Sequence, residues 1–354
     1  MTLGALRYSR VNALVRSMVS RLLTRADWQS LLTAVDVAEV VRLLSETTYG
    51  SQVRAAASPD LPVVERALRL ALADTYDRLI HALLGAPRDL VETLLLRREL
   101  DNLKAILRAV AGQLPRETVF RLLFPLGRYS RLPVEDLLRA GGISEAAELL
   151  DGTAYGRVLH ISLDRYAEEG SLFPVEVALD LDYFRRLWAR VEALSGLDYT
   201  TARKFMGSRY DVLNLDWLIR FRLLYRLSPE EIFNYTLPHG YRITDRIIRR
   251  AAAASDLPGI AAELPEPYRG LLREVGTEPG AVERAEVRLH RQLSEVARSA
   301  FLGYPFQLGE VLAYLWLREA EVHDLEVILE GKRAGRSSEA MAALLWEPAV
   351  QAGT

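Results

Sequence analysis

The chain has 354 residues, of which 50% are hydrophobic and 26% are charged, an ordinary globular composition that is long enough for two or three domains. Its formal net charge of −2 gives no electrostatic reason to expect a nucleic-acid partner or general adhesion to a membrane surface. Because there is no cysteine, disulfides, thiolate metal sites and thiol nucleophiles are excluded.

The sequence also gives no sign of a targeting or membrane-spanning segment. Arginines at positions 7, 10 and 16 interrupt the apolar run at the N-terminus, so it does not have the pattern of a signal peptide. The longest stretch without a charged residue, 299–309, is far shorter than the roughly 20 residues that a spanning helix needs. We therefore expect no direct membrane span.

Apolar residues recur at spacings of three and four through most of the chain, which is the pattern of amphipathic helices. Helices are expected at 65–84, 91–110, 180–195, 210–225, 281–300, 310–330 and 336–346. Proline and glycine fall mostly between these segments, and the alternation that is typical of strands is rare. The sequence thus predicts an all-α fold.

Two segments near the start of the chain are copies of one another. Residues 31–50 read LLTAVDVAEVVRLLSETTYG and residues 137–156 read LLRAGGISEAAELLDGTAYG, with nine identical positions in twenty. Both end in the same dipeptide, Tyr49-Gly50 and Tyr155-Gly156. The leucines return at helical spacing, so we expect each segment to be one amphipathic helix that stops at its glycine. A weaker copy runs from Ile247 to Gly270.

A second element occurs three times. Residues 97–108 (RRELDNLKAILR), 209–220 (RYDVLNLDWLIR) and 319–330 (EAEVHDLEVILE) share an acid, then an aliphatic residue, then Asn or Asp followed by Leu. The repeated polar positions are Glu99, Asn102, Asp211, Asn214, Glu321 and Asp324. Residues 112–131 and 226–245 share a further pattern that ends in Pro-x-Gly.

These copies recur with a period of about 110 residues, which is too long for a solenoid repeat. We therefore predict three similar helical domains, 1–112, 113–226 and 227–354, with approximate three-fold symmetry.

No catalytic motif emerges from the sequence. There is no Walker A loop, and the five histidines are far apart and form no metal-ligand pair. Asp180 and Asp182 could form a metal pair in an all-α isoprenoid synthase, but the second metal-binding helix of such enzymes is missing. We expect no catalytic residue, no metal and no cofactor.

The repeated acid and Asn or Asp have two interpretations. They can cap or bridge neighbouring helices inside each repeat, or they can surround a shared axis and face a partner. We prefer the architectural interpretation, because catalytic groups seldom occur in triplicate within one chain.

Four stretches together resemble a known family: YSRVNALVR at 8–16, VVRLLSETTYG at 40–50, LLLRRELDNLKAILRA at 94–109 and LAYLWLREAEVHDLEVILEGKRAG at 312–335. They are similar to the C subunit of prokaryotic A/V-type rotary ATPases, the counterpart of the eukaryotic V-ATPase d subunit. The resemblance covers nearly the full length. The third copy departs from it by carrying Asp324 where Asn is expected.

The resemblance implies a funnel of three helical domains, peripheral on the cytoplasmic face of the membrane. Such a protein is a non-catalytic rotor part that couples the central-stalk subunits to the membrane rotor ring and transmits torque for ion transport or ATP synthesis. As partner contacts we select three arginines at the repeated helices, Arg98, Arg209 and Arg318. Two alternatives stay open: a soluble all-α scaffold that binds another protein, and an all-α enzyme whose site is assembled from scattered residues.

Overall fold

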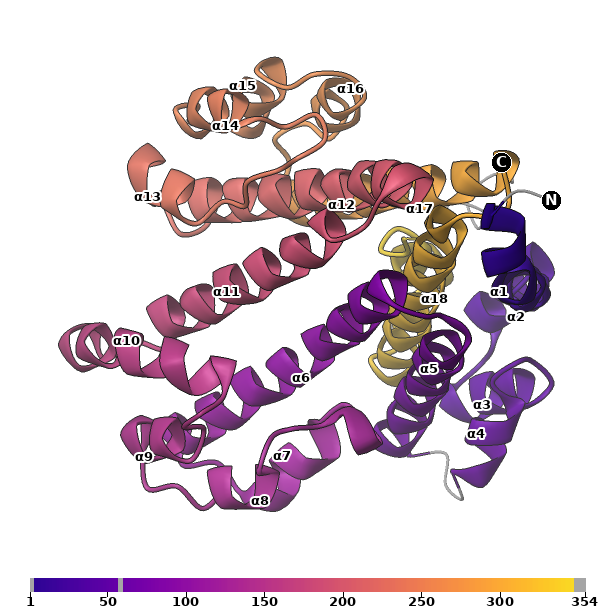
Figure 1. Ribbon diagram of the computed structural model, residues 1–354, viewed down its shortest axis with the longest axis horizontal. Helices are drawn as coiled ribbons and strands as arrows, with labels where there is room; N and C mark the ends of the chain where they lie inside the picture. The colour runs from indigo at the N-terminus through magenta and orange to yellow at the C-terminus, as the bar shows by residue number, and fades with distance from the viewer. Residues whose placement is uncertain (1–2, 57–59, 347–354) are drawn as a thin grey trace. The chain divides into compact units, whose positions relative to one another are not determined.

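In the computed structural model, residues 3–56 and 60–346 are described, and every regular element within those ranges is a helix (Figure 1). The first helices are α1 (Leu3–Val19), α2 (Arg25–Thr33), α3 (Val37–Ser45), α4 (Gly50–Ala55), α5 (Leu61–Ala82), α6 (Ala86–Gly112), α7 (Arg116–Leu122), the 3-10 helix η1 (Gly127–Tyr129), α8 (Val134–Leu137), α9 (Ile143–Glu148) and α10 (Ala154–Glu169). The others are α11 (Phe173–Glu192), α12 (Gly196–Leu223), α13 (Pro229–Asn234), α14 (Asp245–Ala252), α15 (Leu257–Ala262), α16 (Tyr268–Arg273), α17 (Ala281–Ser299), the 3-10 helix η2 (Ala300–Leu302), α18 (Leu308–Arg333) and α19 (Ser338–Ala342). The all-α prediction is confirmed.

Three of the long helices lie where the periodicity placed them. The expected segments 91–110 and 310–330 fall inside α6 and α18, and 281–300 matches α17. Capping boxes begin α2 and α13: the hydroxyls of Thr24 and Ser228 accept from the backbone N–H groups of Asp27 and Glu231, whose carboxylates bond back.

The chain divides into two compact units, and the first combines Met1–Leu61 with Leu194–Thr354. In this unit α12, α17 and α18 pack on one another, and α1 and α3 pack on α18. The short helices α14, α15 and α16 form a separate group beside α12 (Figure 1). Segments from both ends of the sequence therefore share one core.

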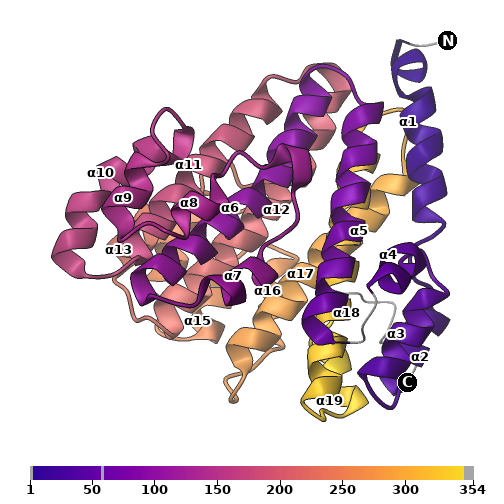
Figure 2. The ribbon, with the colours of Figure 1, turned by 90° about the horizontal axis from the view of Figure 1, so that it is seen from below.

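The second unit is Pro62–Ala193. Its α6 packs against α11 and α9, and α10 packs against α11. Figure 2 shows the short helices α7, α8 and α9 beside α6. Apolar side chains such as Leu68, Leu79 and Leu103 are fully buried in this core.

Helix α18 is buried on nearly all sides, which explains why its first half, LGEVLAYLWL, is apolar apart from Glu310. It also buries charged side chains, among them Glu310, Arg318 and Glu321. A buried charge is costly unless it is paired and hydrogen-bonded, so α18 must find partners for these groups within the protein.

The expectation that 31–50 and 137–156 are single helices is wrong. The first segment holds the end of α2 and all of α3, with a break at 34–36, and the second holds the end of α8, all of α9 and the start of α10. The physical reason is local capping: Asp36 accepts a hydrogen bond from the backbone of Glu39 and so starts a new helix at Val37.

The two repeated glycines do not end helices. Gly50 begins α4 and Gly156 lies in the first turn of α10. A Cβ atom at Gly50 would collide with the carbonyl oxygen of Ser45, and one at Gly156 with that of Leu150. The glycine is therefore needed for close backbone approach rather than for a left-handed stop.

No helix within the described ranges is both long enough and apolar enough to cross a bilayer.

Candidate functional site

The first repeated carboxylate, Glu99, lies on α6 and is 1% exposed. One of its oxygens accepts from the backbone N–H of Arg131, and the other accepts from the hydroxyl of Tyr155 at 2.9 Å. The acid therefore ties the start of α10 and the segment before α8 to the long helix.

The second carboxylate, Asp211 on α12, is completely buried and makes the same connections. It accepts from the backbone N–H groups of Arg242 and Ile243 at 2.8 and 2.9 Å and from the hydroxyl of Tyr268 at 3.2 Å. Burial raises the pKa of Asp211 to about 6, although these hydrogen bonds act in the opposite direction.

The third carboxylate, Glu321 on α18, reaches the beginning of the chain. It accepts from the backbone N–H of Leu23 at 2.6 Å and from the hydroxyl of Tyr49 at 2.7 Å. Arg318 adds an ion pair at 2.5 Å, and its guanidinium lies 3.9 Å from the centroid of the Tyr49 ring. The C-terminal long helix thus holds the N-terminal segment in the way that Glu99 and Asp211 hold the segments that follow them.

Each of the three clusters is a tyrosine hydroxyl, a buried carboxylate and a backbone N–H. Burial, followed by the nearby carboxylate, raises the pKa of Tyr155 and Tyr268, and burial likewise raises the pKa of Tyr49 well above its ordinary value. The phenols therefore stay protonated and act as donors. Because every carboxylate oxygen already has a protein donor, the clusters join segments of the chain.

One turn further along each helix, the repeated amide makes a second connection. The Asn102 side chain accepts from the N–H of Phe124 at 2.7 Å and donates to the carbonyl of the same residue at 2.9 Å. Asn214 does the same with Leu237, at 2.7 and 2.8 Å. An amide is the side chain that can satisfy both groups of one peptide residue at once.

In the third copy this position is Asp324, whose carboxylate can accept a hydrogen bond from the backbone but cannot donate one. It receives the backbone N–H of Trp346 at 2.8 Å, and His323 lies 3.0 Å away. A carboxylate has no proton to give to a carbonyl, so the departure from Asn changes the chemistry of the connection but keeps its place.

The three arginines selected as partner contacts make contacts within the chain. Arg98 lies 3.7 Å from Asp101, and its side chain is 31% exposed. Arg209 pairs with Glu319 at 3.1 Å and lies 5.4 Å from the ring of Trp316. Arg318 is buried in the Glu321 cluster described above. Arg98 is the most accessible of the three.

The two aspartates considered as a metal pair are bonded to cations instead. Asp180 pairs with Lys104 at 2.7 Å and Arg97 at 2.9 Å. Asp182 pairs with Arg186 at 2.8 Å and Arg157 at 3.3 Å. Across the part of the chain that the structure describes, no three acidic or histidine side chains gather as metal ligands.

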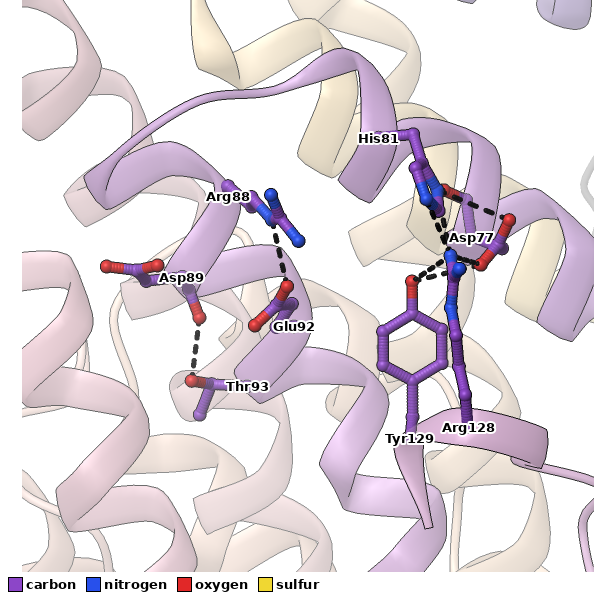
Figure 3. Close-up of polar contacts among 8 residues, drawn as sticks. All are labelled: Asp77, His81, Arg88, Asp89, Glu92, Thr93, Arg128 and Tyr129. Carbon is purple, nitrogen blue, oxygen red and sulfur yellow. Dashed lines mark hydrogen bonds and ion pairs between the residues drawn. The ribbon is translucent and has the colours of Figure 1, made fainter.

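A more exposed polar cluster joins α5 to η1 (Figure 3). Arg128 donates to Asp77 and lies against the ring nitrogens of His81, and the hydroxyl of Tyr129 donates to Asp77 at 3.0 Å. Burial by itself would raise the pKa of the Asp77 carboxyl, but the hydrogen bonds from Arg128 and Tyr129 lower this pKa below its ordinary value. The same view shows two contacts within α6, Arg88 with Glu92 at 2.9 Å and Thr93 with Asp89 at 2.7 Å.

Sequence reasoning missed several members of these clusters. Tyr268 lies near the end of the weaker copy 247–270, and its place before Arg-Gly is the signal that points to it. The backbone partners Phe124 and Leu237 each directly precede the proline of a Pro-x-Gly turn, which was a second signal. The donor at Leu23 had no signal, because a backbone N–H has no side-chain signature.

The family model described as "ATP synthase (C/AC39) subunit" matches residues 11–344 of the chain. The match therefore spans all three repeated long helices and the N-terminal segment that bonds to Glu321.

Individual relatives agree in extent. The C subunit of the A-type ATP synthase of Methanothermobacter thermautotrophicus is 30% identical over 93% of this chain and 85% of its own length. The C subunit of Methanocaldococcus jannaschii is 27% identical over 96% of this chain and 86% of its own length. The C subunit of Haloquadratum walsbyi is 27% identical over 93% of this chain and 95% of its own length.

Proposed function

Since the chain belongs to the ATP synthase (C/AC39) subunit family, and so is a subunit of a rotary ATPase, we propose that it is the non-catalytic part that couples the central stalk to the membrane rotor ring. In this role it transmits torque for ion transport or ATP synthesis. It works at the cytoplasmic face, as a peripheral part of the complex.

The observation that carries the proposal is the cyclic pattern of the three carboxylate clusters. With domains bounded at 1–112, 113–226 and 227–354, Glu99 of the first bonds to Tyr155 of the second, and Asp211 of the second bonds to Tyr268 of the third. Glu321 of the third bonds to Tyr49 of the first. Connections that pass from each domain to the next, and from the last to the first, support a closed three-domain funnel with pseudo-three-fold symmetry.

A body of packed helices suits a coupling part. Close-packed interiors deform little under load, and buried hydrogen-bonded charges resist separation because breaking one partner leaves the other unsatisfied. The repeated acids Glu99, Asp211 and Glu321 all accept hydrogen bonds in such connections, which supports a mechanical role over a catalytic one. Arg98 remains our candidate for a contact with a partner protein of the complex, while Arg209 and Arg318 at the equivalent helices are bonded to acids within the chain.

The test is assembly with purified partners. The chain is mixed at micromolar concentration with the central-stalk subunits of the same ATPase and, separately, with its detergent-solubilised rotor ring. We expect a stoichiometric complex with each by size-exclusion chromatography. A chain that binds neither would contradict the proposal, and one that binds only proteins outside the complex would support the general scaffold.

A further inference from the structure

The turn before α14 and α14 itself carry an unusual density of arginine. Residues 239–250 (HGYRITDRIIRR) contain four arginines and a single acid, Asp245, in a chain whose net charge is −2. We call three of these arginines, Arg242, Arg246 and Arg249, the α14 basic face. All three are exposed.

Two of these arginines are held by aromatic rings. The guanidinium of Arg249 lies 3.4 Å from the centroid of the Phe233 ring, and that of Arg242 lies 5.7 Å from the centroid of Tyr241. A guanidinium that stacks on a ring has lost much of its freedom, yet its N–H edges stay available for a carboxylate. Stacking therefore prepares these side chains to bind an anion.

Two of the neighbouring acids have other partners. Glu231 is bonded to Ser228 in the capping box of α13, and Glu263 pairs with Arg250. Within residues 3–56 and 60–346, no acidic side chain forms an ion pair with a member of the α14 basic face. The corresponding turn of the first copy differs, because Arg128 is bonded to Asp77 and Tyr129 inside the chain (Figure 3).

The other two copies carry no arginine at the positions of Arg249 and Arg250. The N-cap residues Asp36, Gly142 and Asp256 of α3, α9 and α15 align the three segments. In all three copies, the two residues that stand five and four positions before the N-cap are buried. They are Leu31-Leu32, Leu137-Leu138 and Ala251-Ala252. The two exposed positions just before them are Gln29-Ser30, Glu135-Asp136 and Arg249-Arg250. The buried pair is therefore present in all three copies, whereas the exposed pair before it is neutral in the first copy, negative in the second and positive in the third.

We propose that the α14 basic face binds an acidic segment of another polypeptide. Arg246 and Arg249 lie about 4.5 Å apart along the helix axis, which matches carboxylates one turn apart on a partner helix. Arginine and carboxylate form paired, charge-assisted hydrogen bonds. A protein segment fits better than nucleic acid or a lipid surface, because the patch is small and the chain as a whole has a net charge of −2, which does not attract extended polyanions.

The test uses the full chain and a fluorescein-labelled helical peptide with glutamates one turn apart. By fluorescence anisotropy at low ionic strength, we expect saturable binding that weakens with added salt. The double variant R246E/R249E should bind about ten-fold more weakly. The variant Phe233→Leu, which removes the ring beneath Arg249, should bind a few-fold more weakly.

The matched control is R116E/R121E, which makes the same change of net charge on two exposed arginines of α7. It should keep the affinity of the natural chain, and circular dichroism should show that both double variants are folded. Equal losses in the two double variants, an unchanged R246E/R249E, or tighter binding to duplex DNA or anionic vesicles than to the peptide would overturn the proposal. No other protein of the ATPase takes part, so the result is independent of the proposed rotary role.

Discussion

At the scale of single residues, the molecule depends on polar groups that are buried because they are fully bonded. Asn102 and Asn214 each satisfy one backbone N–H and one carbonyl on a neighbouring segment. Removing such a side chain leaves both backbone groups without a partner in the interior, which costs more than the hydrogen bonds themselves contribute. These residues should therefore be sensitive to small substitutions.

We predict that Asn102→Ala and Asn214→Ala each lower the free energy of unfolding by about 2–4 kcal/mol, because two buried backbone groups lose their partner. Urea titration followed by circular dichroism measures the change. Asn234→Ala, at an exposed position of α13, should shift the free energy by less than about 0.5 kcal/mol. Losses of similar size in all three variants would contradict this account.

Asp211 should make the stability depend on pH. Its pKa is raised to about 6 by burial, above its ordinary value of about 3.9, so the folded state holds the proton more tightly than the unfolded state does. The stability that Asp211 contributes is therefore fully present below about pH 4 and is lost as the pH rises through about 6.

Asp211→Asn cannot titrate. We therefore expect the free energy of unfolding of the natural chain, relative to this variant, to fall by up to about 3 kcal/mol between about pH 4 and pH 7. Urea titrations at several pH values give the difference directly. A difference that stays constant over that range would show that Asp211 is not perturbed as described.

At the scale of elements, the N-terminal segment is a structural partner of the last long helix. Tyr49 and Leu23 bond to Glu321, and Lys332 and Ser338 donate to the carbonyl of Leu32 at 2.7 Å. These contacts join residues about 300 positions apart, so the cluster closes a very long loop in the chain.

A double-mutant cycle should detect this connection. We expect Tyr49→Phe and Glu321→Gln to destabilise the protein singly, and their coupling energy to be about 1–3 kcal/mol because the two groups share a buried charge-assisted hydrogen bond. Hydrogen exchange in α2 and α3 should quicken in either single variant. Additive effects, with no change in exchange at the N-terminal segment, would argue against a direct bond.

The sequence was informative about helices and less so about their connections. Period-3.6 patterns in 91–110 and 310–330 predicted α6 and α18, because burial of one face, or of all faces, determines which residues are apolar. The break inside 31–50 was missed, since a capping aspartate such as Asp36 differs little from any exposed aspartate.

The candidate site was predicted in part. Repetition identified the acids, the amides and the tyrosines Tyr49 and Tyr155, because these side chains recur at fixed spacing. It could not show that Tyr49 bonds to Glu321 instead of the nearer Glu99, because sequence order does not reveal which copy a segment packs on.

At the scale of the whole molecule, family membership and the cyclic connections point to one proposed task, which is to couple two moving parts without catalysing a reaction. A coupling part should be dispensable for ATP hydrolysis in the catalytic head and indispensable for linking hydrolysis to ion movement. That separation distinguishes it from an enzyme and from a general scaffold.

The most direct test of this central claim is reconstitution of the ATPase in vesicles with and without this chain, with hydrolysis and ion uptake measured together. We expect complexes lacking the chain to retain ATP hydrolysis and to lose ion uptake, and added chain to restore uptake. Ion uptake that persists without the chain, or hydrolysis that stops in the detached head when the chain is removed, would contradict the account.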